Sequence, residues 1–392
     1  METCALYLHI PFCRHRCAYC DFNTYAGLES LIPEYVRALQ REIRFLGEGA
    51  DPSLRVATVF LGGGTPSLLP LNALEGIFRA LRDSFSLAAE AEISLEANPG
   101  TVDLPYLRGL RSLGVNRLSF GVQSANPAEL RLLERIHDYP QAIQAVAWAR
   151  QAGFANLNLD LIFGLPGQSL DAWQRSLELA LGLRPEHLAL YALTLEHGTP
   201  MQHWVGRGLL PAPDPDLAAE MYEWAAARLA QAGYVQYEIS NWARGEAYFC
   251  RHNLRYWRGE PYLGLGAGAH GYIPGLRTVT ARAPRAYIRR LEAPPRPLEF
   301  PRTPATVEAR RLTPAEEMGE YMMMGLRLTQ EGVSAARFRQ RFGLPLEAAY
   351  GAQIARLTAL GLLEWAGEDR LRLTPRGRLL GNRVFMEFVG ER

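Results

Sequence analysis

The strongest constraint on the fold is a repeated alternation of apolar and amphipathic segments in the first half of the chain. Helical patterns, for example at 71–81, 139–152 and 170–181, lie between short apolar segments. Strands that alternate with helices favour a parallel sheet with helices on its outer face, joined by right-handed crossovers. The six strands are expected at 5–10, 56–61, 92–96, 117–122, 156–162 and 187–193.

Residues suited to chemistry follow the ends of these predicted strands. A cysteine cluster follows the first strand, and the glycine-rich turn 62–65 follows the second. Functional groups at the carboxyl ends of the strands are typical of βα barrels. We therefore expect an α/β fold in which residues 1–200 form a partial (βα)6 TIM-like barrel, although the pattern does not distinguish six strands from eight.

Two further domains are expected after the barrel. Residues 201–300 read as an α+β extension, in which the glycine- and aromatic-rich segment 245–275 is expected to be an irregular loop. Residues 301–392 read as helices followed by a β-wing, which resembles a winged-helix module.

Composition narrows the class of protein. The chain has 392 residues, 48% of them hydrophobic, and its 42 basic and 41 acidic residues give a formal net charge of +1. This balance gives no electrostatic footprint for nucleic acid. No uncharged apolar stretch is long enough for a transmembrane helix, and the first residues lack the pattern of a secretory signal. We expect a cytoplasmic protein.

Three of the five cysteines, Cys13, Cys17 and Cys20, have the spacing C-x3-C-x2-C. Thiolates are soft ligands that suit iron–sulfur clusters or zinc. Three thiolates on a four-iron cluster leave one iron open to another ligand. A structural zinc ion needs a fourth ligand, for which His15 and Cys250 are candidates without the usual spacing. We favour the cluster, and zinc is the alternative.

Five motifs together resemble one family. LYLHIPFCRHRCAYCDF, GGGTPS, EANPGT, LSFGVQS and DLIFGLPGQ are similar to the motifs of radical S-adenosylmethionine (SAM) proteins related to oxygen-independent coproporphyrinogen III oxidase. Within that group, the chain most resembles the HemW-type heme chaperones. The resemblance implies a radical SAM barrel, with a [4Fe–4S] cluster on the three cysteines and with bound SAM.

The resemblance also implies which residues contact SAM. Three match positions around a first SAM molecule, namely Tyr7, Gly63 and Glu96. Six match positions around a second, namely Tyr19, Gly64, Thr65, Gln123, Arg135 and Asp160. The sequence does not decide whether one or two SAM molecules bind, or whether SAM is cleaved.

Two features separate the chain from the oxidase. Phe22 stands where the oxidase pattern has a fourth cysteine, and the segment from His252 to Trp257 matches the H-N-x-x-Y-W motif of HemW-type proteins. Imidazole is a common axial ligand of heme iron. We expect His252 to contact heme as axial ligand, with Tyr256 and Trp257 as an apolar wall. The alternative is a loop histidine hydrogen-bonded to backbone, with the aromatic residues in the core.

Three functions follow from these observations. The first is a heme chaperone that transfers heme to an acceptor, such as a membrane-bound respiratory heme protein reached by peripheral membrane contact. The second is an oxygen-independent coproporphyrinogen III oxidase, against which the absent fourth cysteine argues. The third is a zinc-stabilised protein that binds nucleic acid, which the neutral net charge disfavours.

Overall fold

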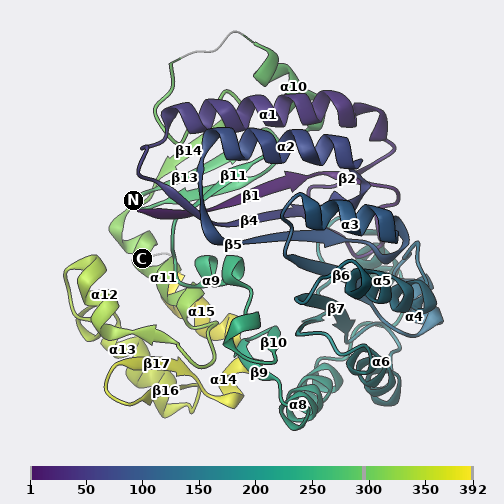
Figure 1. Cartoon of the computed structure of the whole chain (residues 1–392). Helices are drawn as coiled ribbons and strands as arrows, with labels where there is room; N and C mark the ends of the chain where they lie inside the picture. Colours follow the sequence, from purple (N-terminus) through teal and green to yellow (C-terminus); the bar gives the residue numbers. More distant parts are fainter. Residues whose placement is uncertain (1, 294–296, 390–392) are drawn as a thin grey trace.

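The computed structural model describes residues 2–293 and 297–389. Its centre is a strongly curved sheet with six parallel strands, which contain the six predicted segments almost entirely (Figure 1). These strands are β1 (Thr3–Ile10), β4 (Arg55–Gly63), β5 (Ser86–Ala97), β6 (Arg117–Gln123), β7 (Leu157–Phe163) and β8 (His187–Ala192).

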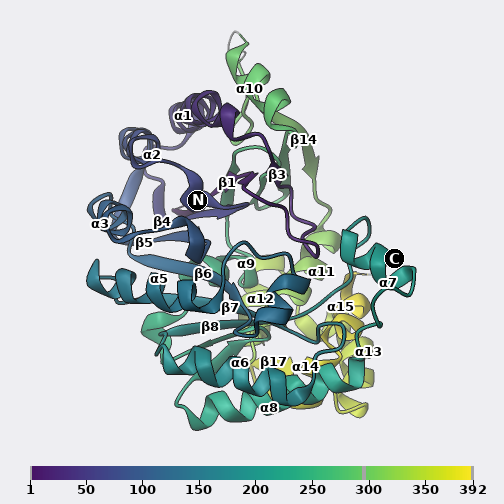
Figure 2. The same ribbon diagram turned by 90° about the vertical axis from the view of Figure 1, so that its right-hand side faces the viewer.

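Helices cover the outer face of the sheet, as the alternation predicts (Figure 2). They bury apolar stripes against the strands, and one continuous core joins helices and sheet. The main covering helices are α1 (Ile32–Gly49), α2 (Leu71–Ser84), α3 (Leu104–Ser112), α5 (Tyr139–Gln151), α6 (Leu170–Gly182) and α8 (Pro215–Gln231).

The sheet is open, so the barrel is partial. Its order is β14-β13-β12-β11-β1-β4-β5-β6-β7-β8-β10-β9. Segments after the barrel, including one beyond residue 300, therefore add strands to both edges of the barrel sheet, and the described residues of 201–300 form no separate sheet. The added strands are β9 (Val235–Glu238), β10 (Asn241–Ala243), β11 (Tyr262–Leu265), β12 (His270–Ile273), β13 (Leu276–Thr280) and β14 (Thr306–Arg311).

The prediction of an irregular loop at 245–275 is wrong in part. Helix α9 (Arg251–Trp257) and strands β11 and β12 lie within it. The seven residues of α9 include neither glycine nor proline, so nothing in them opposes a helix. The H-N-x-x-Y-W motif is consequently helical. The glycines of this segment lie outside α9, in the connections and in β11 and β12.

The carboxyl-terminal module has the predicted winged-helix character, with its own hydrophobic core. A three-stranded sheet contains β15 (Val333–Ser334), β17 (Arg370–Leu373) and β16 (Leu363–Ala366). Its helices are α11 (Pro314–Gly325), α12 (Ala335–Phe342), α13 (Leu346–Ala359), α14 (Pro375–Leu379) and α15 (Gly381–Val389). The division at residues 200 and 300 stays a prediction.

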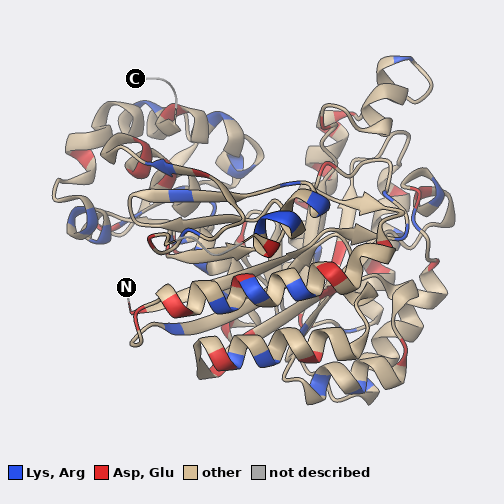
Figure 3. Ribbon diagram, turned by 90° about the horizontal axis from the view of Figure 1, so that it is seen from above, with Lys and Arg blue, Asp and Glu red and all other residues tan. Residues whose placement is uncertain are grey.

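Basic and acidic residues are interspersed over the ribbon seen from above (Figure 3). Across residues 2–293 and 297–389, no helix has both the length and the apolar character needed to cross a bilayer.

Candidate functional site

The three clustered cysteines lie directly after β1 and line one cavity of about 500 Å³. Cys13 ends the short strand β2 (Phe12–Cys13), and a backbone hydrogen bond from Cys20 to Cys17 closes a turn (3.1 Å). Thr65 Oγ1 donates to Cys13 Sγ at 3.6 Å, and Arg135 Nη1 donates to Cys17 Sγ at 3.3 Å. Such donors can hydrogen-bond to the sulfurs of metal-bound thiolates.

The donor set suits a cluster better than a single ion. Burial raises the pKa of Cys13 to about 11, the bond from Thr65 lowers it, and the nearby Cys20 and Cys17 raise it again. The three thiols are therefore within electrostatic range of one another. Yet no three His, Cys, Asp or Glu side chains converge on a single-ion position within the described part of the chain. A multi-iron cluster gives each thiolate its own iron.

The turn after β4 brings backbone close to this cavity. Gly63 has φ +112°, and a Cβ there would lie 2.4 Å from the ring of His9. A Cβ on Gly64 would lie 2.6 Å from the carbonyl oxygen of Phe12. Only glycine fits both positions. The turn thus exposes backbone groups that a ligand can approach.

Two carboxylates face the interior of the barrel beside this turn. Glu96 Oε2 accepts a hydrogen bond from Gly63 N at 3.0 Å. Burial, and next the charge of Asp160, raises the pKa of Glu96 to about 7. Asp160 accepts from Ser119 Oγ (3.0 Å) and from Asn158 Nδ2 (2.8 Å). These oxygens can bind ligand hydroxyls.

The structure brings together the residues expected around SAM. All of them except Tyr7 line the cavity that the cysteines line, and Tyr7 lines the cavity next to it. Arg135 is partly buried at the wall of this cavity. It bonds both to Cys17 and to the carbonyl oxygen of Gly121, the latter at 2.7 Å.

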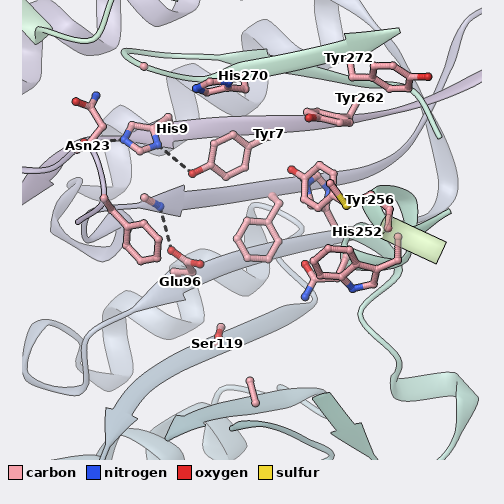
Figure 4. A pocket seen from close by; sticks show the side chains of 18 of the residues that line it. Tyr7, His9, Asn23, Glu96, Ser119, His252, Tyr256, Tyr262, His270 and Tyr272 are labelled. Atoms are coloured by element: carbon pink, nitrogen blue, oxygen red, sulfur yellow. Dashed lines mark hydrogen bonds between the residues drawn. The ribbon is translucent and has the colours of Figure 1, made fainter. Parts of the chain in front are cut away.

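The second cavity is larger, about 850 Å³, and borders the first at Gly63, Glu96 and Asp160. Its walls come from the barrel interior, from strands β11 and β12, and from α9, α11 and α12. Figure 4 shows Tyr256, Tyr262 and Tyr272 gathered at one end of it. Cavities of this size that carry aromatic walls and a few polar groups are typical of organic ligand sites.

His252 lines this second cavity, but both nitrogens of its ring are already hydrogen-bonded. Nδ1 hydrogen-bonds with Thr58 Oγ1 and Nε2 with the hydroxyl of Tyr256, both at 2.8 Å. Burial, and next Arg117 and Arg255, lowers its pKa to about 3, so the ring is neutral. The ring is therefore hydrogen-bonded, as the alternative expected, but to side chains and from a helix, not to backbone from a loop.

The sequence analysis missed several polar residues on the inner face of the barrel. Arg117 and Ser119 alternate with outward apolar residues on β6, and Asn158 does the same on β7. Arg117 lines the larger cavity with 2% exposure. The signal was present, because a polar residue at every second position of a parallel strand indicates an interior-facing row.

Comparison with known proteins shows to which family the chain belongs. The heme chaperone HemW of Bacillus subtilis (strain 168) is 38% identical over 98% of this chain and 99% of its own length. HemW of Mycobacterium tuberculosis (strain H37Rv) is 40% identical over 98% of this chain and 94% of its own length. The chain belongs to the HemW family. Residues 7–180 of this HemW-family chain match the radical SAM superfamily model, and residues 312–380 match the HemN C-terminal domain.

A solved structure agrees with this placement. Coproporphyrinogen III oxidase (HemN) from Escherichia coli, described as a radical SAM enzyme, superposes with a TM-score of 0.84 at 25% identity. The match covers 99% of this chain and 90% of that one. The radical SAM fold predicted for this HemW-family chain is therefore confirmed, together with its HemN-type carboxyl-terminal module.

Proposed function

We propose that this chain is a heme chaperone, which binds heme in the larger cavity and passes it to an acceptor protein. The observation that carries the proposal is the cavity of about 850 Å³ in a member of the HemW family. Its tyrosine side chains offer apolar faces to a porphyrin. Its arginines offer cations to the acidic side chains that heme carries.

The smaller cavity is proposed to hold the resident cofactors. Cys13, Cys17 and Cys20 are the proposed ligands of a [4Fe–4S] cluster, whose fourth iron stays open to SAM. The glycine turn and the carboxylate of Glu96 are placed to bind SAM through backbone and hydroxyl contacts. Tyr7 stands where the two cavities adjoin.

The acceptor is proposed to be a respiratory heme protein, and the chaperone a cytoplasmic one that meets a membrane only peripherally. Tyr256 and Trp257 line the larger cavity and are proposed to pack on the heme. His252 stays a candidate contact, although its hydrogen bonds must break before it can bind iron.

Heme titration tests the function. The anaerobically reconstituted protein is titrated with hemin, and absorbance in the Soret region is followed. Saturable binding, followed by transfer to the apo form of a b-type heme protein after the free hemin is removed, is expected. If hemin does not bind saturably, or never reaches the acceptor, the proposal fails.

A second assay separates the chaperone from the oxidase. Reconstituted protein is incubated with coproporphyrinogen III, SAM and a reductant without oxygen. We expect no protoporphyrinogen, since Phe22 occupies the position of the fourth cysteine. Turnover would favour the oxidase.

The cluster ligands are tested by a matched pair of variants. Cys17→Ala removes a proposed ligand, whereas Cys4→Ala removes a buried cysteine of the sheet core that lines neither cavity. Iron and sulfide contents near wild type are expected in C4A, with loss of the cluster absorbance in C17A. Equal iron contents in the two variants would contradict the assignment.

A further inference from the structure

Three histidines line the larger cavity, and they differ in what their rings bind. His9 hydrogen-bonds through Nδ1 with Tyr7 and through Nε2 with the carbonyl oxygen of Asn23, both at 2.9 Å. His252 is engaged at both nitrogens. His270 is exposed, and its ring makes no hydrogen bond with any residue of 2–293 or 297–389. Figure 4 shows it beside Tyr7, on the neighbouring wall.

The backbone that carries His270 is held firmly. His270 begins β12, which pairs with β13 on one side. In the preceding turn, Gly266 N donates to the buried carboxylate of Glu42 at 2.8 Å, and Ala267 N donates to the hydroxyl of Tyr35 at 2.8 Å. A ligand on a rigid element loses little conformational entropy when it binds. The backbone that carries the His270 imidazole is therefore preorganised.

The surroundings of His270 also suit an iron porphyrin. Partial burial at the cavity wall, and next Arg282 and Arg277, lowers the pKa of His270, which favours the neutral imidazole that metal ligation requires. Arg277 is paired with Glu320, but Arg282 is exposed and forms no ion pair with a described residue. Arg282 is thus available to a carboxylate of the porphyrin.

We propose that His270, and not His252, supplies the protein ligand to the heme iron in the larger cavity. The proposal rests on the function proposed above. His252 keeps a structural role, because it joins Thr58 on β4 to Tyr256 on α9. Ligation by His270 breaks no hydrogen bond within the described chain, whereas ligation by His252 breaks at least one hydrogen bond in a buried site, which is unfavourable.

The test compares three alanine variants, at His270, His252 and the exposed His203, which lies on α7 (Pro200–Gly206) away from the cavity. Each is titrated with hemin and, separately, with iron-free protoporphyrin IX. Loss of groups that merely orient metal ligands costs about 10–100-fold in metal affinity. We therefore expect H270A to weaken hemin binding by at least about ten-fold, to change the Soret spectrum, and to leave protoporphyrin IX affinity unchanged.

The outcomes separate this inference from the function itself. A wild-type spectrum in H203A, a wild-type Soret position in H252A even where its affinities for hemin and protoporphyrin IX fall together, and restoration of H270A by added imidazole support ligation by His270. An unchanged hemin spectrum in H270A overturns it while leaving heme binding intact. If wild-type protein binds no hemin, the proposed function fails. Because protoporphyrin IX binds without iron, its affinity also reports whether each variant keeps a folded cavity.

A different observation carries a second inference. Arg117 is the first residue of β6 and lies on the barrel interior. Within the described residues, its Nε has no hydrogen-bond partner and no carboxylate lies within ion-pair distance of it. Its register partner Ser94 on β5 is fully buried, and its hydroxyl also lacks a partner. Glu92 and Asp160 act on the Arg117 guanidinium only from beyond ion-pair distance, and a buried guanidinium without a direct carboxylate partner is costly. We infer that Arg117 binds a carboxylate of the ligand in the larger cavity, a propionate if that ligand is heme.

Esterification tests this second inference directly. Hemin and hemin dimethyl ester differ in their free carboxylates, so wild-type protein should bind hemin more tightly than the ester. Arg117→Met should remove that preference while binding the ester as wild type does. Retention of the full preference in R117M would overturn the inference, and ester binding shows that the variant is folded.

Discussion

The buried carboxylate of Glu96 should make the protein less stable as pH rises. Burial, and next Asp160, raises its pKa from the ordinary value of 4.5 to about 7. Between these values the folded protein holds a proton that the unfolded chain has released. The free energy of unfolding therefore falls as pH rises through this window. Replacement by glutamine should remove that loss.

The size of the effect follows from the pKa. At 1.36 kcal/mol per pKa unit, a rise from 4.5 to about 7 corresponds to about 3 kcal/mol at the alkaline side. The carboxylate borders both cavities, where water screens it. We therefore expect Glu96→Gln to gain about 1–2 kcal/mol more at pH 8 than at pH 5.

Urea unfolding of the cofactor-free protein at the two pH values measures this difference. Glu75→Gln, on the exposed face of α2, controls for removal of a surface carboxylate. E96Q should also weaken SAM binding, since residues that bind a ligand are often kept at a cost in protein stability. An E96Q variant whose stability relative to wild type is the same at both pH values would refute the reasoning.

Two further predictions concern the scaffold. Gly63→Ala should lower the free energy of unfolding by about 1–3 kcal/mol and weaken SAM binding, because its Cβ would lie 2.4 Å from the His9 ring. Gly153→Ala, at φ +90° with no atom within 4 Å, measures the cost of the positive φ alone. An equal loss of stability in both variants would contradict the steric reason. Glu42→Ala should lower the free energy of unfolding, measured by thermal unfolding, by about 3 kcal/mol or more, since Gly266 N–H and two buried hydroxyls lose their acceptor. Glu42→Gln should lower it less, and similar losses in the two variants would argue against the hydrogen-bond network.

Much of the architecture could be predicted from the sequence because the signals are local. Apolar strands and helical stripes follow one another along the chain, and each needs only its own neighbours to be recognised. The two edges of the sheet could not be predicted this way. β11 pairs with β1 across more than 250 residues of chain, and no local pattern encodes that pairing.

The candidate site likewise has features that the local sequence determines and features that only the tertiary structure decides. The sequence determined that three thiols lie within eight residues and that glycines follow β4, because both requirements are met inside one short segment. Only the tertiary structure decided that Arg135, 118 residues away, bonds Cys17. It also decided that His252 is hydrogen-bonded to Thr58, 194 residues away, while the ring of His270 has no hydrogen-bond partner among the described residues. Which side chains meet depends on strand register and packing, and these are fixed only when the whole sheet has closed around its cavity.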